Sequence, residues 1–168
     1  MPSDGERTRP FWVILTLTVV VDRITKVLAD RDLPGRAVHL IGDTVQLRLV
    51  HNQGAAFGLE LGAWQRWIFL AIAVAAIAWL WSASRQAPAS DTLRQFAVAF
   101  VAGGAAGNAV DRLLSSRGVI DYIDVGIGAL RWPTFNVADI AVTCGAVALA
   151  ISLWREDARR APAPASSV

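Results

Sequence analysis

The sequence predicts an all-α membrane protein with four transmembrane helices. Of its 168 residues, 54% are hydrophobic and 18% are charged, whereas soluble domains average about 45–50% and about 25%. The apolar residues also gather in blocks, and a helix needs about 20 such residues to cross a bilayer. Lipid is therefore the expected surrounding, and the length suits one compact domain of four spans.

The first span is predicted at residues 11–29, after a polar leader at residues 1–10 that we expect in the cytoplasm. Phe11–Val21 contains no charged residue, and an amphipathic stretch continues it. Asp22 stands where a signal-peptide cleavage site would need small residues, so the segment is expected to remain as an uncleaved helix. Pro10 lies at the predicted helix start, where a missing N–H leaves no hydrogen bond unmade.

Three further apolar blocks predict spans at residues 64–81, 93–114 and 134–154. The first of these blocks carries tryptophans at both ends, as the interfacial aromatic belt of membrane proteins does. The second contains the small-residue stretch Ala102–Gly107, which allows close helix approach in lipid. The tail at residues 155–168 is rich in Pro, Ala and Ser and is predicted to be disordered and cytoplasmic.

Two outer loops, residues 30–63 and 115–133, are expected on the side opposite the termini, because four spans return the chain to its starting side. Alternating apolar and polar residues in Val45–Leu49 predict a β-strand in the longer loop. Lys and Arg are denser on the terminal side, although their raw number is larger on the outer side. The density favours a multi-pass protein with both termini in the cytoplasm.

The polar composition excludes several classes of function. A formal net charge of +2, without a basic run interleaved with aromatic residues, gives no sign of nucleic-acid binding. The single cysteine, Cys144, excludes an intrachain disulfide and a Cys-based zinc site. His39 and His51 lack the spacing of metal ligands, so no metal site is expected.

Charged residues recur at one depth of the predicted bundle. At about 1.5 Å per residue, antiparallel packing brings five of them to the same leaflet, the one farther from the termini. A charge in hydrocarbon costs about 2.5–3.5 kcal/mol, so such side chains are expected to face the bundle interior. The five residues are Asp22, Lys26, Asp111, Arg112 and Asp139.

Structural ion pairs are one interpretation of this cluster, with Asp22 bound to Lys26 and Asp111 bound to Arg112. Asp139 differs, because no Lys or Arg lies within a turn of it along its own helix. It must find a base elsewhere or take up a proton.

A second carboxyl group is a candidate partner for Asp139. Asp121 stands in an apolar segment just before the fourth span, and Asp124 is a rival that spacing alone does not exclude. Two carboxyls at hydrogen-bonding distance share a proton, as in aspartic proteases. One can then take a proton from water while the other polarises a peptide carbonyl.

Five short motifs follow one another in an order that resembles the lipoprotein signal peptidase family, also called signal peptidase II. Each motif is weak alone, whereas five in order within a four-span chain are specific. The resemblance covers about residues 11–154. The motifs are Asp22–Lys26, Asn52–Phe57, Gly107–Arg112, Val119–Tyr122 and Phe135–Asp139.

The resemblance implies an intramembrane aspartic endopeptidase of the bacterial inner membrane, with its active site near the outer leaflet. Its substrates would be diacylglyceryl-modified prolipoproteins, whose signal peptide is cut off just before the lipidated lipobox cysteine. The family needs no cofactor and is inhibited by the peptide antibiotic globomycin. It also has a small extracytoplasmic β-structured cradle and a short helix, to which residues 30–63 correspond, and membrane lipids are its surroundings.

Residue by residue, the resemblance implies that Asp121 and Asp139 are the catalytic pair. Three further residues look structural, namely Asp22, Lys26 and Asp111. The positions expected to line or support the site, and to hold substrate backbone or inhibitor, are Asn52, Gly54, Asn108, Arg112 and Asn136.

Three departures from the family pattern are Arg23, Tyr122 and the linker at residues 115–118, and none removes a carboxylate of the pair. An alternative function is that of a small proton or ion transporter that uses embedded carboxylates. That alternative expects the charges near the bilayer midplane. A non-catalytic scaffold protein, a third possibility, would tolerate Asp139→Asn.

Overall fold

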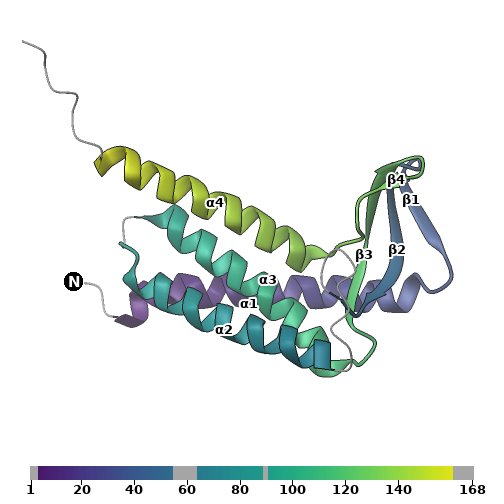
Figure 1. The fold of residues 1–168 in the computed structure, drawn as a ribbon, viewed down its shortest axis with the longest axis horizontal. Helices are drawn as coiled ribbons and strands as arrows, with labels where there is room; N and C mark the ends of the chain where they lie inside the picture. Colours follow the sequence, from purple (N-terminus) through teal and green to yellow (C-terminus); the bar gives the residue numbers. More distant parts are fainter. Residues whose placement is uncertain (1–3, 55–63, 89–90, 161–168) are drawn as a thin grey trace, which may run out of the picture.

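The computed structural model describes residues 4–54, 64–88 and 91–160. In this part of the chain the helices lie side by side, and a small sheet covers one end of the bundle (Figure 1). The start of the first helix and the end of the last lie at the other end. The helices are α1 (Asp4–Asp32), α2 (Gln65–Gln86), α3 (Thr92–Leu114) and α4 (Val137–Arg160).

The sheet is antiparallel, and its strands stand in chain order. The predicted strand at Val45–Leu49 lies within the second strand, and the shorter outer loop supplies the third, which pairs with it. The prediction of a mostly helical chain with a small β-structured part is thus confirmed. The strands are β1 (Ala37–Ile41), β2 (Val45–Asn52), β3 (Val119–Ile127) and β4 (Leu130–Arg131).

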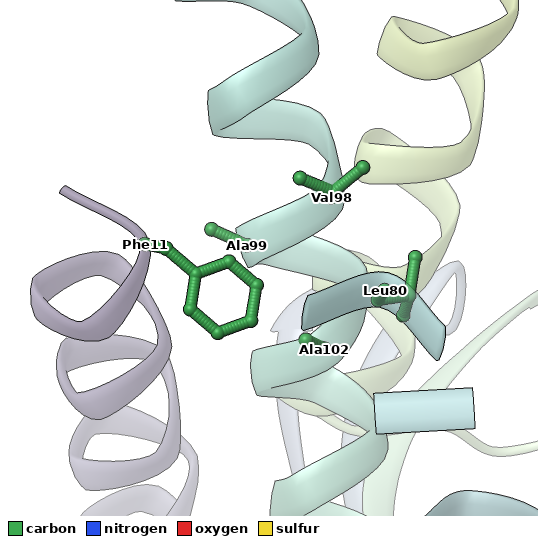
Figure 2. Close-up of a cluster of buried hydrophobic side chains, with 5 residues drawn as sticks. All are labelled: Phe11, Leu80, Val98, Ala99 and Ala102. Carbon is green, nitrogen blue, oxygen red and sulfur yellow. The ribbon is translucent and has the colours of Figure 1, made fainter. Parts of the chain in front are cut away.

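Helix α3 is the central element of the bundle and packs against α1, α2 and α4. Near the end far from the sheet, Phe11 of α1 and Leu80 of α2 pack with three small side chains of α3 (Figure 2). Small residues let the neighbouring helices come close to the backbone of α3. The three are Val98, Ala99 and Ala102.

A second apolar cluster fixes the sheet to the bundle. Ala29 of α1 and Leu33, the residue after α1, pack with Ile120 and Tyr122 of β3. Because Asp121 stands between the last two residues, this cluster also fixes the stretch of backbone that carries it.

The distribution of polarity in α1 is the reverse of that in a soluble protein. Val20, Val21 and Ile24 are exposed, whereas the side chains of Asp22 and Lys26 are 1% and 0% exposed. Large apolar side chains on the outside and charges on the inside are the arrangement expected in lipid. Among the described residues, α2 and α4 are the helices apolar and long enough to cross a membrane.

Two ends of helices differ from the prediction. Helix α1 begins at Asp4, so Pro10 lies inside the helix and not at its start, where it removes one backbone hydrogen bond. Helix α4 runs to Arg160, so the predicted disorder is wrong for residues 155–160. An ion pair of 3.1 Å between Glu156 and Arg94 connects this extension to α3.

Two other expectations concern chain segments next to helices. The fourth span was expected from residue 134, but α4 begins at Val137, because Asn136 caps it. A short helix was also expected within residues 30–63. Residues 55–63 of this range lie outside the described part of the chain.

Gly107→Ala is expected to lower the melting temperature of the protein, because α3 lies against α1 at this glycine. A Cβ there would stand 2.6 Å from Asp22 Oδ2 and 3.3 Å from the Cβ of Ala138. Overpacking of this kind costs about 1–3 kcal/mol. Thermal unfolding followed by tryptophan fluorescence measures the effect. Ala106→Ser, at a partly exposed neighbouring position, is the control, and equal melting temperatures in both variants would contradict the packing argument.

Candidate active site

Two carboxylates, Asp121 of β3 and Asp139 in the first turn of α4, are held by one residue. The side-chain Nδ2 of Asn136 donates to Asp121 Oδ1 over 2.7 Å. The backbone N–H of Asn136 donates to Asp139 Oδ2 over 3.1 Å. Asp121 is buried and Asp139 is partly exposed. The structure thus brings the two candidate catalytic residues together at the sheet end of the bundle.

The local structure at the start of α4 sets the position of Asp139. Asn136 Oδ1 accepts a hydrogen bond of 3.0 Å from the backbone N–H of Asp139, and Asp139 accepts one from the N–H of Asn136. This reciprocal pair is a capping box. The residue before it, Phe135, is bonded through its backbone to Ile123 of β3. A negative charge in the first turn of a helix is also favoured by the helix dipole.

The amide of Asn52 approaches Asp121 from β2. Its Oδ1 accepts the backbone N–H of Gly54 over 3.0 Å. The amide nitrogen is therefore left to donate to Asp121 Oδ2 over 2.9 Å. Both oxygens of the Asp121 carboxylate thus accept an amide hydrogen, and Gly54 acts through the orientation of Asn52.

Asn108 of α3 is oriented in the same way toward Asp139. Its Oδ1 accepts from Lys26 Nζ over 2.9 Å and from Asn136 Nδ2 over 3.1 Å. Its Nδ2 consequently donates to Asp139 Oδ1 over 2.8 Å. The amide is fixed because its carbonyl oxygen faces an ammonium group.

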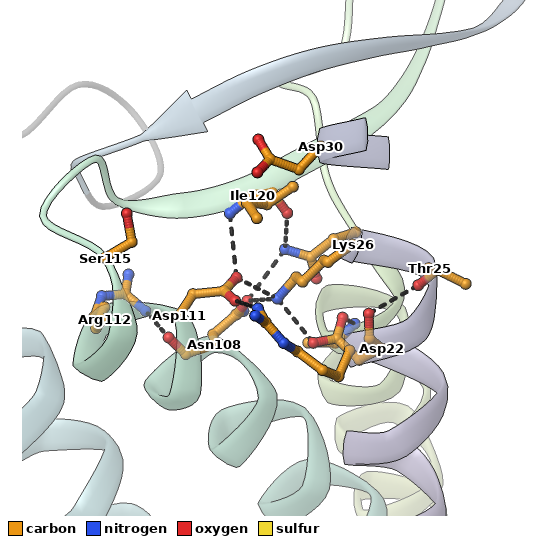
Figure 3. Close-up of polar contacts among 12 residues, drawn as sticks. Asp22, Thr25, Lys26, Asp30, Asn108, Asp111, Arg112, Ser115 and Ile120 are labelled. Carbon is orange, nitrogen blue, oxygen red and sulfur yellow. Dashed lines mark hydrogen bonds and ion pairs between the residues drawn. The ribbon is translucent and has the colours of Figure 1, made fainter. Parts of the chain in front are cut away.

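Lys26 of α1 is the centre of a buried polar network (Figure 3). Its ammonium group lies 2.8 Å from Asp22 Oδ2, 2.9 Å from Asp111 Oδ2 and 2.9 Å from Asn108 Oδ1. Three acceptors satisfy the three hydrogens that an ammonium group carries. The lysine is therefore fully paired although its side chain has no exposed surface.

The two aspartates of this network also hold the backbone beside each candidate catalytic residue. Asp22 Oδ1 accepts the N–H of Ala138 over 2.9 Å, next to Asp139. Asp111 Oδ2 accepts the N–H of Ile120 over 3.2 Å, next to Asp121. The structural role expected for Asp22, Lys26 and Asp111 is thus the connection of α1 and α3 to both carboxylate-bearing segments.

One of the two predicted ion pairs is absent from the described contacts. Asp22 pairs with Lys26 as expected, but the ion-pair partners of Asp111 are Lys26 and Arg23, the latter at 3.2 Å. Adjacent residues of a helix point in different directions, so Arg112 faces away and donates to the backbone oxygen of Asn108 over 3.2 Å.

Arg112 nonetheless belongs to the site through its charge. Its guanidinium interacts electrostatically with Asp121 and Asp139 and lies 5.2 Å from the ring centre of Phe69 in α2. Arg66 of α2 donates to the backbone oxygen of Arg112, which satisfies a carbonyl at the end of α3. A positive charge thus lies near two carboxylates without forming an ion pair with either.

Asp124, the alternative to Asp121, has different partners. Its carboxylate lies 3.0 Å from Arg131 Nε and 3.4 Å from Arg48 Nε, within the sheet. The geometry therefore brings Asp121, and not Asp124, to Asn136.

Burial raises the pKa of Asp121 to about 6, and the charge of Asp139 acts in the same direction. The hydrogen bonds from Asn52 and Asn136 oppose this shift, because they stabilise the charged form. Asp121 thus holds a proton to a higher pH than an ordinary aspartate. A protonated carboxyl can act as a general acid.

Several of these contacts were not predicted from the sequence. The asparagines were expected to bind substrate or inhibitor, and in the structure their amides bind the carboxylates. The spacing Asn-x-x-Asp at residues 136–139 is a capping signal that could have given the Asn136–Asp139 contact. No comparable signal pointed to Asn108 as the partner of Lys26, since these residues stand on different helices.

Comparison with known proteins agrees with this architecture. A sequence description of the family "Signal peptidase (SPase) II" matches residues 14–155. The lipoprotein signal peptidase of Burkholderia mallei is 36% identical over 88% of this chain and 89% of its own length. That of Paraburkholderia phymatum is 37% identical over 86% and 87%.

Solved structures agree with the fold. A bacterial membrane enzyme determined by the in meso method superposes with a TM-score of 0.78 over 93% of this chain and 94% of its own, at 24% identity. A second such membrane enzyme gives a TM-score of 0.75 over 85% and 91%, at 27% identity. Taken with the sequence matches, these similarities show that the protein is a membrane-associated peptidase. It belongs, specifically, to the signal peptidase II family.

Proposed function

We propose that the protein is an intramembrane aspartic endopeptidase that removes the signal peptide from diacylglyceryl-modified prolipoproteins, just before the lipidated cysteine. The names of its relatives support the substrate class. The single observation that supports the catalytic assignment is the shared contact of Asp121 and Asp139 with Asn136. Asp121 and Asp139 are the proposed catalytic residues.

The proposed topology has four spans, α1 to α4, in the bacterial inner membrane. Both chain termini are placed in the cytoplasm, and the sheet and the carboxylates lie at the outer leaflet. The apolar outward side chains of α1 and its buried charges support the embedding of this helix. Helix α3 packs against three neighbouring helices. Because less of its surface faces lipid, its Ala- and Gly-rich sequence can be less apolar than those of α2 and α4.

In the proposed reaction, the ionised Asp139 takes a proton from a water molecule as it attacks the carbonyl carbon of the scissile bond. Protonated Asp121 donates a hydrogen bond to the carbonyl oxygen and stabilises the developing charge. Asn52, Asn108 and Asn136 hold the two carboxyls in place, so that no reorganisation accompanies the proton transfer. Arg112 offers a positive charge to substrate oxygen atoms near the pair.

A lipid-linked substrate meets this site without leaving the membrane. Asp121 belongs to β3 and Asp139 to the first turn of α4, and the sheet lies at the same end of the bundle as the start of α4 (Figure 1). A scissile bond at the bilayer surface, beside its own acyl chains, is at the same level. A transporter using embedded carboxylates would instead place them near the bilayer centre.

The direct test is cleavage of a diacylglyceryl-modified prolipoprotein by the purified protein in bilayers, followed by gel shift. Cleavage is expected with the lipidated substrate and is expected to stop with a globomycin-type inhibitor. The same precursor without its lipid, in which the lipobox cysteine is free, is the control. Equal cleavage of both forms, or none of either, would contradict the proposed substrate class.

The rate of cleavage is expected to fall as the pH rises through about 6, where Asp121 loses its proton. The raised pKa means that the acid form is present below this pH and depleted above it. The pH profile of kcat/KM, which reports groups of the free enzyme, measures the midpoint. Asn52→Ala removes a hydrogen bond that lowers this pKa, so its midpoint is expected at higher pH. An unmoved or lower midpoint would argue against Asp121 as the acid.

A further inference from the structure

Arg66, in the first turn of α2, binds the end of the helix that carries Arg112. Its Nε donates to the backbone oxygen of Arg112, and its Nη2 donates to that of Leu113 over 2.8 Å. The last four carbonyls of a helix have no partner within the helix itself. A guanidinium presents its donors in a rigid fork, so two adjacent carbonyls bound by one fork are held in a fixed position relative to α2.

The guanidinium of Arg112 lies between its own helix and α2. Its Nη1 donates to the backbone oxygen of Asn108 over 3.2 Å (Figure 3), and its Cζ lies 5.2 Å from the ring centre of Phe69. Phe69 stands three residues after Arg66, so both lie on the same face of α2. This face therefore contacts the backbone of Arg112 through Arg66 and its side chain through Phe69.

The start of α2 is itself held against the site. Gln65 is buried, and its Nε2 donates to the backbone oxygen of Gln53, the residue after Asn52. The amide of Asn52 in turn donates to Asp121. The first turn of α2 thus contacts both the end of β2, which positions Asn52, and the end of α3, which carries Arg112.

The two carboxylates do not themselves hold Arg112 in place. Its guanidinium interacts electrostatically with Asp121 and Asp139, but among the described contacts it forms no ion pair with either. The place of this charge relative to the pair therefore depends on how the end of α3 is held. Arg66 is the side chain of α2 that holds it.

We propose that Arg66 is a positioning residue of the reaction, which sets the place of the Arg112 charge beside the catalytic pair by holding the last turn of α3. The inference rests on the proposed function, because the charge of Arg112 matters to the rate only if the pair acts on a substrate. A misplacement of about 1 Å in an active site can lower a rate by about 10²-fold. The loss of Arg66 is therefore expected to lower kcat.

Two substitutions of Arg66 test the proposal in the full chain in bilayers, with a lipidated prolipoprotein as substrate. Arg66→Met removes both hydrogen bonds, and kcat is expected to fall by up to about 100-fold with a much smaller change in KM, since Arg112 acts where charge develops in the transition state. Arg66→Lys keeps a cation but not the fork, so an intermediate kcat is expected. Arg85→Met, the same change in the exposed last turn of α2, is the control and is expected to keep the wild-type kcat.

A double-mutant cycle separates positioning from support of the fold. In an Arg112→Lys background, Arg66→Met is expected to lower kcat by a much smaller factor than in the wild type, because the guanidinium that it positions is already absent. Melting curves check that each variant folds, and Arg66→Lys replaces Arg66→Met in the cycle if the latter does not. An equal factor in both backgrounds, or a wild-type kcat in Arg66→Met, would overturn the proposal. A wild-type protein that did not cleave the lipidated substrate would instead overturn the proposed function on which the inference rests.

Discussion

Asp139→Asn is expected to abolish cleavage of a lipidated prolipoprotein, and Asp121→Asn is expected to do the same. Removal of a general acid or base lowers the rate by roughly 10²–10⁴-fold, and neither asparagine can take up or release a proton. Both replacements keep the size of the side chain and one oxygen that can accept the hydrogen bonds from Asn136. The variants should therefore insert and fold, which a melting curve of each purified protein would check.

Asp124→Asn is the matched control for this pair. It makes the same chemical change three residues from Asp121 on the same strand, but its carboxylate binds Arg48 and Arg131. Activity is expected to persist in this variant, with some loss of stability. If Asp139→Asn or Asp121→Asn retained full activity, the proposed reaction would be wrong; if only Asp124→Asn were inactive, the partner of Asp139 would have been assigned incorrectly.

Lys26→Met is expected to cause the largest loss of stability of any single change in the bundle. Asp22 and Asp111 share the buried Lys26, and Arg23, whose side chain is 41% exposed, also pairs with Asp111. Removal of the lysine therefore leaves the buried carboxylate of Asp22 without a cation. Breaking a buried ion pair in this way costs about 3–5 kcal/mol. Asn108 also loses the cation that orients its amide toward Asp139, so kcat is expected to fall more than KM changes.

Thermal unfolding and steady-state kinetics measure these two effects separately. In the double variant Lys26→Met with Asp22→Asn, charge balance returns, and an asparagine at residue 22 still offers an oxygen to the N–H of Ala138. Stability is expected to recover in part, whereas kcat is expected to stay low because Asn108 remains without its cation. Full recovery of kcat would show that Lys26 acts on stability alone.

The prediction from sequence succeeded where the signal was local. Apolar blocks gave the helices, and the alternation at Val45–Leu49 gave the central part of β2. The fourth span was predicted to begin at residue 134, three positions before α4 begins. The apolar residue Phe135 looks like part of the span, although its backbone pairs with β3.

The site was harder to predict because its contacts join residues distant in the chain. Lys26 and Asn108 are 82 positions apart, and Asn52 and Asp121 are 69 apart. Sequence spacing made Asp121 and Asp124 equally good candidates for the partner of Asp139. The register of β3 against β2, which pairs Asp121 with Val50 and Asp124 with Gln46, distinguishes them. The neighbour of Asp111 along the helix, Arg112, was a misleading partner for the same reason: the folded chain supplied nearer ones from α1.

The capping box at the start of α4 has a consequence for how the chain tolerates changes in length. The turn between β3 and β4 has open space around Gly128, so an added residue there would lengthen a loop and leave the pair of carboxyls where it is. One residue added between Asn136 and Asp139 would swing the second carboxyl about 100° around the helix axis, away from its partner. The interval of three residues between Asn136 and Asp139 is thus fixed, whereas the β3–β4 turn can accept an added residue.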